Sequence, residues 1–232
     1  WVYGLYTAFV YLTPFFGGLL ADRVLGRRWA VIVGGVLMAI GHFLMAMENL
    51  FFPALMFLIL GNGCFKPNIS TQVGKLYPEG DHRRDSAFSI FYIGINVGAF
   101  LAPMICGTLG QTSINGVQHW HWGFAAAGVG MVLGLISYVM FQRYLPDEPP
   151  PTPSKSAPIA GVAVYLVGVT LMIFGLLYVM TLPLVVRGIL AGLVLLALVV
   201  WLVRLPRDER PRVIAIFVAC FIVAAFWAVY EQ

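Results

Sequence analysis

Polar residues interrupt this chain only at wide intervals. Between them lie eight stretches with almost no charge, at approximately 1–21, 29–47, 51–74, 86–108, 120–142, 159–181, 186–203 and 213–232. An α-helix needs about 20 apolar residues to cross the hydrocarbon core of a bilayer, and a helix satisfies its own backbone groups there. The pattern therefore predicts an all-α, polytopic membrane protein with eight spans.

Composition supports the same class of protein. Hydrophobic residues make up 60% of the 232 positions and charged residues 10%, and the mean hydropathy is +0.88. A soluble domain carries about 25% charged residues. Cys64, Cys106 and Cys220 all fall inside apolar runs without the spacing of metal ligands, so we interpret them as packing thiols and expect no metal site.

The positions of the basic residues orient the predicted spans. Loops 22–28, 75–85, 143–158 and 204–212 hold twelve of the fourteen Lys and Arg residues, whereas the alternate loops 48–50, 109–119 and 182–187 hold one. The positive-inside rule places the basic loops in the cytoplasm. The net charge of +4 then reflects topology, and nucleic-acid binding is not expected. Because this arrangement puts both ends outside, we expect a truncated chain, with at least one further helix before Trp1.

A proline-rich segment divides the chain. Residues 146–158 hold six prolines in thirteen positions, a composition typical of a stiff, extended linker. We predict a bundle at 1–144, a linker with a two-helix insertion at 145–210, and the first helix of a second bundle at 211–232. In the helix pair 159–203 the only ionisable residue is Arg187, at the turn. With nothing polar on its faces, the pair is expected to be peripheral.

Lys66 is the first candidate functional residue. A charge inside an apolar span is costly and marks a functional site unless the side chain can reach the interface. The helix from Pro67 to Lys75 places that interface roughly 13 Å away, which is far for a snorkelling lysine, the alternative interpretation. Pro67 should also bend the helix beside Lys66.

Glu231 is the second intramembrane charge. Helical rise places it about 27 Å above the cytoplasmic end of its span, whereas Lys66 lies about 20 Å below the outer surface. The two charges are then too far apart in depth to pair directly, so each needs another partner. The alternative is that Glu231 lies at the outer interface.

Polar groups of two other spans are further candidates. Tyr92 and Asn96 are four residues apart and share one helix face. They either line a water-filled cavity or serve an interhelical hydrogen bond through Asn96. Gly94 and Gly98 form a small-xxx-small pair that predicts close helix packing. Tyr11 is a mid-span phenol that, by itself, is interpreted as a core residue.

The first cytoplasmic loop is unusually rich in glycine and charge. We expect it to latch helix ends through a relay of charges, although a generic basic loop is the alternative. The residues concerned are Asp22, Arg23, Arg27 and Arg28. His119 and His121 are two candidate metal ligands without a third, and interfacial packing beside Trp120 and Trp122 is favoured.

Several of these strings resemble one family. GGLLADRVLG, at 17–26, resembles the loop between the second and third helices of the major facilitator superfamily. GNGCFKPNIS, at 61–70, and FSIFYIGIN, at 88–96, together resemble the signature of its proton-dependent oligopeptide transporters. RRDSAFSIFY and FWAVYEQ match the same family, and the resemblance runs from Trp1 to Gln232.

The resemblance implies a partial major facilitator fold. The chain would supply helices 2–6 of the first bundle, the two-helix insertion of bacterial members, and helix 7. Residues lining the peptide site would be Tyr11, Lys66, Tyr92, Asn96, Trp227 and Glu231, with Lys66 and Glu231 also serving proton coupling. In the family these two charges pair with partners on other helices, which agrees with the depth argument. The ExxER motif of helix 1 is missing, so the fragment is not expected to transport by itself.

The predicted function is proton-coupled symport of di- and tripeptides across the bacterial cytoplasmic membrane by alternating access. Short peptides, protons and the lipid bilayer would be the partners, with no cofactor. A facilitator for another small solute is the alternative. An intramembrane enzyme would need a nucleophile–base pair or a metal cluster in a span, and only Lys66 and Glu231 ionise there.

Overall fold

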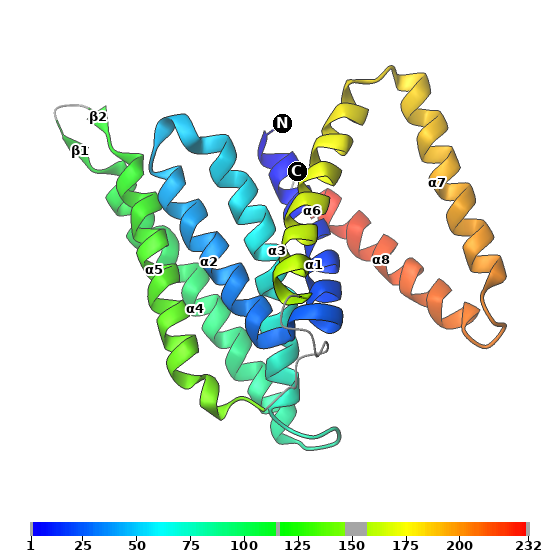
Figure 1. The fold of residues 1–232 in the computed structure, drawn as a ribbon, viewed down its shortest axis with the longest axis horizontal. Coiled ribbons are helices and arrows are strands. Elements are labelled where there is room, and N and C mark those ends of the chain that lie inside the picture. Colours follow the sequence, from blue (N-terminus) through cyan, green and yellow to red (C-terminus); the bar gives the residue numbers. More distant parts are fainter. Residues whose placement is uncertain (1, 115–116, 147–156, 231–232) are drawn as a thin grey trace. The chain divides into compact units, whose positions relative to one another are not determined.

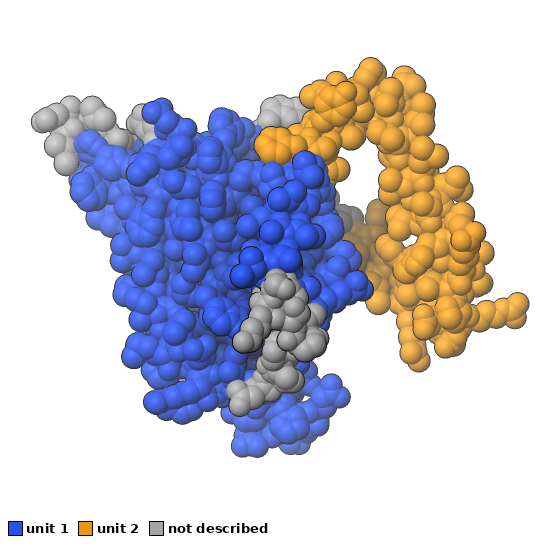
Figure 2. All heavy atoms as spheres, in the orientation of Figure 1, with its two compact units in different colours: residues 1–173 blue, residues 174–232 orange. Residues whose placement is uncertain are grey.

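The computed structural model describes residues 2–114, 117–146 and 157–230, and the chain divides into two compact units, residues 1–173 and 174–232 (Figure 2). The first unit contains five long helices and the first part of a sixth (Figure 1): α1 (Val2–Leu20), α2 (Arg27–Met45), α3 (Phe51–Lys75), α4 (Arg83–Gln111), α5 (Trp120–Phe141) and α6 (Ala157–Thr181). The second unit continues with the end of α6, then α7 (Leu184–Arg204) and α8 (Arg210–Tyr230).

The predicted all-α class is confirmed, and each of the eight expected spans corresponds to one helix. The loop expected at 109–119 differs, because it holds a short antiparallel hairpin of β1 (Ser113–Ile114) and β2 (Val117–Gln118). Among the described residues, six helical segments are long and apolar enough to cross a membrane. The segment α3 is not one of them, and polar residues such as Asn62, Lys66, Asn68 and Gln72 interrupt its apolar sequence.

Glycines set the packing of the first unit. Helix α3 packs against α1 and α2, while α5 packs against α2 and α4. The Cα of Gly17 faces the backbone of Gly63, and a Cβ built on Gly34 would lie 2.7 Å from the carbonyl oxygen of Gly61. Helices that approach this closely need residues without side chains at the contact. The contacts of α3 with α1 and with α2 therefore depend on glycine.

The connection from α1 to α2 is compact. The last turn of α1 widens into a π-helical segment at Ala21–Leu25, and the chain then reverses at Gly26, where φ is +76°. This left-handed region favours glycine, because a Cβ would be strained there. The amide of Gly26 donates to the carbonyl of Ala21 at 2.9 Å, which closes the turn. The turn places the charged residues of the loop at one end of the unit.

Helix α6 differs from the expectation for the inserted pair. Its first part belongs to the first unit, where Tyr165, Val169 and Ile173 are buried. The Tyr165 hydroxyl donates to the carbonyl of Leu60 at 2.8 Å. The expectation that nothing polar lines this helix pair was therefore wrong, since one face of α6 carries a buried phenol. Its aromatic ring made it resemble an ordinary lipid-facing residue in the sequence.

Candidate functional site

The structure brings together two of the predicted site residues, Lys66 of α3 and Tyr11 of α1. The Nζ atom of Lys66 lies 4.8 Å from the centroid of the Tyr11 ring, a cation–π geometry. Both side chains are exposed, and Tyr11 is 70% accessible. Within the described chain, no carboxylate lies within ion-pair distance of Lys66. The ammonium group thus lies on an open face, where an anionic group can approach it.

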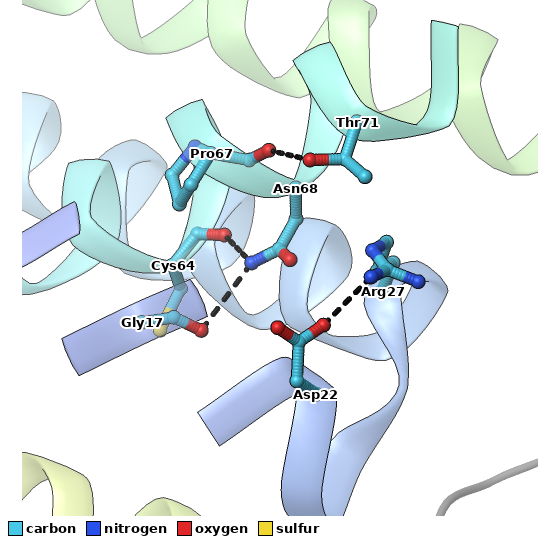
Figure 3. Close-up of polar contacts among 7 residues, drawn as sticks. All are labelled: Gly17, Asp22, Arg27, Cys64, Pro67, Asn68 and Thr71. Carbon is cyan, nitrogen blue, oxygen red and sulfur yellow. Dashed lines mark hydrogen bonds and ion pairs between the residues drawn. The ribbon is translucent and has the colours of Figure 1, made fainter. Parts of the chain in front are cut away.

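Side chains stabilise α3 on both sides of Pro67, which cannot donate a backbone hydrogen bond. The amide of Asn68 donates to the carbonyl of Cys64 at 2.7 Å and reaches that of Gly17 in α1 at 3.4 Å (Figure 3). The Thr71 hydroxyl donates to the carbonyl of Pro67 itself, at 2.7 Å. Helix α3 therefore continues through Pro67, with side-chain hydrogen bonds on both sides of the proline.

Tyr92 and Asn96 lie on the same exposed face of α4. The Nδ2 atom of Asn96 donates to the carbonyl of Tyr92 at 2.9 Å, and the phenol ring of Tyr92 is 58% accessible. Asn96 thus bonds its own helix, and no interhelical bond of its amide is seen among the described residues. The phenol and the remaining polar groups of the amide stay open to a ligand.

A groove between α3, α4 and α5 is lined on α4 by Gly94 and Gly98, and Tyr92 and Asn96 are not among its lining residues. Its volume is about 780 Å³, and Phe65, Gly94, Gly98, Gly130 and Gly134 are among its lining residues. A Cβ at any of these four glycines would meet nothing within 4 Å. The close packing expected at Gly94 and Gly98 is not present in the described chain and stays a prediction.

The four charged residues of loop 22–28 make different contacts. Arg27 forms an ion pair with Asp22 at 2.7 Å (Figure 3). Arg28 donates to the carbonyls of Leu145 and Pro146 at 2.6 and 3.0 Å, whereas Arg23 is exposed. The loop thus connects the start of α2 to the end of α5.

The basic loops also share one end of the first unit. Pro146, to which Arg28 donates, lines one groove with Lys75 and Arg84 from the next basic loop. In the same loop, hydrogen bonds from Arg83 hold the pKa of the Asp81 carboxyl below its usual range. Three segments that the charge pattern assigned to one side of the membrane therefore lie together.

Comparison with known proteins identifies the family. The model of the POT family matches residues 28–232. The whole chain aligns with the "Uncharacterized transporter YclF" of Bacillus subtilis at 37% identity and with a "Di-/tripeptide transporter" of Lactococcus lactis at 36%. The chain belongs to the POT family.

A solved structure agrees with this assignment. A POT family transporter in complex with a thioalcohol-conjugated peptide superposes with a TM-score of 0.71 at 34% identity, over 98% of this chain and 49% of the other. The chain spans about half the length of the curated relatives it matches, 49% of both the Bacillus and the Lactococcus proteins. As a member of a transporter family with several apolar helices, the protein is a multi-pass membrane protein.

Two of the site residues expected from the POT resemblance fall where the structure gives no geometry. Trp227 lies in α8 and its side chain is not described, and Glu231 lies outside the described residues. Because α8 belongs to the second unit, the contribution of these residues to a site with Lys66 stays a prediction.

Sequence reasoning missed the buried polar residues around the POT signature. Thr13, Asn68 and Gln72 are between 0% and 4% exposed, and the Tyr138 hydroxyl donates to Gln72 at 2.9 Å. A signal was present, because Cys64, Asn68 and Gln72 recur every four residues and therefore share one face of α3. That face meets other helices, while Lys66 lies on the exposed side.

His119 and His121 lie edge to face, with ring centroids 5.1 Å apart, and His121 also lies beside Trp122. No group of three metal-ligating side chains occurs among residues 2–114, 117–146 and 157–230. The two imidazoles thus have aromatic neighbours, as expected for interfacial packing.

Proposed function

We propose that the full-length protein is a proton-coupled symporter of di- and tripeptides in the bacterial cytoplasmic membrane. The observation that carries the proposal is the exposed ammonium of Lys66, within the long helix α3 and over the ring of Tyr11. POT relatives that are named peptide transporters point to the same substrate class. Because the chain spans about half of their length, the activity is proposed for the whole protein.

The candidate residues match the chemistry of a short peptide. A peptide presents a carboxylate, an amine and backbone amides. In our proposal Lys66 binds the carboxylate, Glu231 carries the opposite charge for the amine or the proton, and Tyr11, Tyr92, Asn96 and Trp227 line the site. Since these groups would bind the termini and backbone of the peptide, the site would accept peptides with many different side chains.

Coupling to protons follows from the cost of an uncompensated charge inside a membrane. An ammonium in a span is costly unless a carboxylate or water compensates it. Binding a peptide carboxylate, or deprotonating a nearby acid, changes that cost and thereby shifts the balance between the two access states. Protons would act as the coupling ion without a cofactor, and Asp22 with Arg23, Arg27 and Arg28 would gate the cytoplasmic side.

Replacing Lys66 tests this function. In the full-length protein, Lys66→Ala should insert and fold, because it removes a costly charge, but should lose gradient-driven dipeptide accumulation. Counterflow, which needs no gradient, should survive in part. The measurement is dipeptide uptake into proteoliposomes with and without a proton gradient, and Lys75→Ala at the end of the same helix is the control.

Two outcomes would contradict the proposal. Gradient-driven accumulation at the wild-type level by Lys66→Ala would exclude Lys66 from coupling. Failure of the wild-type protein to accumulate any dipeptide, combined with uptake of a sugar or a drug, would favour the alternative, a major facilitator transporter for another small solute.

A further inference from the structure

Helix α6 presents a single stripe of residues to the first unit. Positions 161, 165, 169 and 173 recur every four residues, and Tyr165, Val169 and Ile173 are 6%, 3% and 1% exposed. On other faces of the helix, Val164 is 72% exposed. An apolar helix that served only as a connection would show no such difference between faces. The stripe identifies α6 as a specific packing partner of the bundle.

Two small residues make room for this contact. A Cβ built at Gly161 of α6 would crowd Leu20 and Val24, at the end of α1. A Cβ at Gly63 of α3 would collide with the hydroxyl of Tyr165. The phenol therefore reaches the backbone of α3 through a gap that a side chain at position 63 would close.

The carbonyls that precede Lys66 are held by two different helices. Tyr165 of α6 donates to the carbonyl of Leu60 at 2.8 Å, and Thr13 of α1 donates to the carbonyl of Ile59 at 3.1 Å. Both donors are buried. These adjacent carbonyls lie less than two helical turns before Lys66, in the segment that leads to Pro67. Hydrogen bonds from two other helices thus hold α3 in the turns before Pro67. At Pro67 the helix lacks one of its own backbone hydrogen bonds.

We propose that Tyr165 is a positioning residue for Lys66, and that the inserted helix α6 thereby takes part in substrate binding instead of only joining two bundles. The proposal rests on the proposed peptide transport. A helix that contains proline bends where it is least constrained. The hydrogen bond from Tyr165 to the carbonyl of Leu60, called the anchor below, therefore determines where the following turns of α3 place the ammonium group of Lys66. Loss of the anchor should move Lys66 relative to the peptide carboxylate without unfolding the protein.

The variant Tyr165→Phe removes only the hydroxyl. Phenylalanine keeps the ring that fills the stripe, so the full-length variant should fold. The matched control is Tyr178→Phe, the same change on the same helix at a tyrosine that is 66% exposed. Dipeptide uptake into proteoliposomes gives KM and Vmax separately. Hydrogen exchange at the α3 amides of residues 60–66 reports the local anchor without any need for transport.

We expect Tyr165→Phe to raise KM by about three- to tenfold, the range that one buried hydrogen bond represents. Exchange at residues 60–66 should accelerate, while exchange in α2 stays unchanged, and Tyr178→Phe should alter neither. If Tyr165 served only the stability of the fold, the variant would have a lower Vmax, because less protein would be folded, and an unchanged KM. That result would overturn the proposal. So would unchanged exchange at residues 60–66. Absence of dipeptide uptake by the wild type would instead refute the proposed function, and the exchange measurement would still test the anchor.

Discussion

Polar side chains inside the predicted spans follow two different patterns at the scale of single residues. Thr13, Asn68 and Tyr165 are buried and donate to backbone carbonyls of α3 or of its neighbour α1. Lys66 and Tyr92 are exposed and remain available to a ligand. Burial costs a polar group its water, so the buried set must be hydrogen-bonded within the protein. The buried polar residues of this set therefore serve the packing of α3, whereas the exposed ones stay candidates for a site.

The glycine seam between α1 and α3 gives a prediction at the same scale. Gly17→Ala should lower the thermal stability of the full-length protein in detergent, because the new methyl group would collide with the backbone of Gly63. Overpacking of this kind costs about 1–3 kcal/mol. Thermal unfolding of the purified variants is the measurement.

The neighbouring residue provides the control for this experiment. A Cβ at Gly18 would meet only Pro67, at 3.9 Å, which is ordinary contact. Alanine also favours the helix over glycine by roughly 1 kcal/mol, so Gly18→Ala should match the wild type or exceed it. Equal stability of the two variants would mean that α1 and α3 do not approach each other at Gly17.

At the scale of elements, loop 22–28 joins helices that are distant in the sequence. Arg28 precedes the body of α2, yet it donates to two carbonyls that follow α5. A charged donor on two carbonyls at a helix end both satisfies those acceptors and complements the helix dipole. The loop therefore contacts the segment after α5 through its position at this end of the bundle as well as through its charge.

Removal of this contact should loosen the end of α5. We expect Arg28→Ala to accelerate hydrogen exchange at residues 142–145, because the carbonyls that follow the helix lose their donor, while exchange in α3 stays unchanged. Arg23→Ala is the matched control, since Arg23 is an exposed arginine of the same loop. Identical exchange in the two variants would show that Arg28 does not anchor α5.

The arrangement of basic loops is a property of the whole molecule. Arg28, Lys75, Arg84 and Pro146 come from three loops and lie at one end of the first unit. The positive-inside rule assigns this end to the cytoplasm. The unit therefore has the alternation of helix directions that the sequence requires.

Cysteine labelling in intact cells tests the orientation of the full-length protein. An impermeant thiol reagent should modify a Thr112→Cys variant, in the loop after α4, and should leave an Arg84→Cys variant unmodified until the cells are permeabilised. A cysteine-free background is the control. Labelling of Arg84→Cys but not of Thr112→Cys in intact cells would reverse the assigned topology.

The sequence by itself determined the helices, their order and the family. Span boundaries were close to those observed, because the hydrocarbon thickness of a bilayer fixes the length of an apolar run and charged residues end it. The strings around Lys66 and Asn96 were specific enough to indicate the POT family, to which the comparisons assign the chain. Both kinds of signal are local in the sequence.

Only the tertiary structure decided which faces of the helices meet. In an apolar helix almost every position is suitable for lipid or for protein, so composition did not distinguish Tyr165, which bonds α3, from Tyr178, which is exposed. The tertiary structure also placed the ring of Tyr11 on the open face beside Lys66, although its sequence context predicted a core residue. Helix association in a membrane depends on close packing and a few hydrogen bonds, and those require the partner helix to be in place.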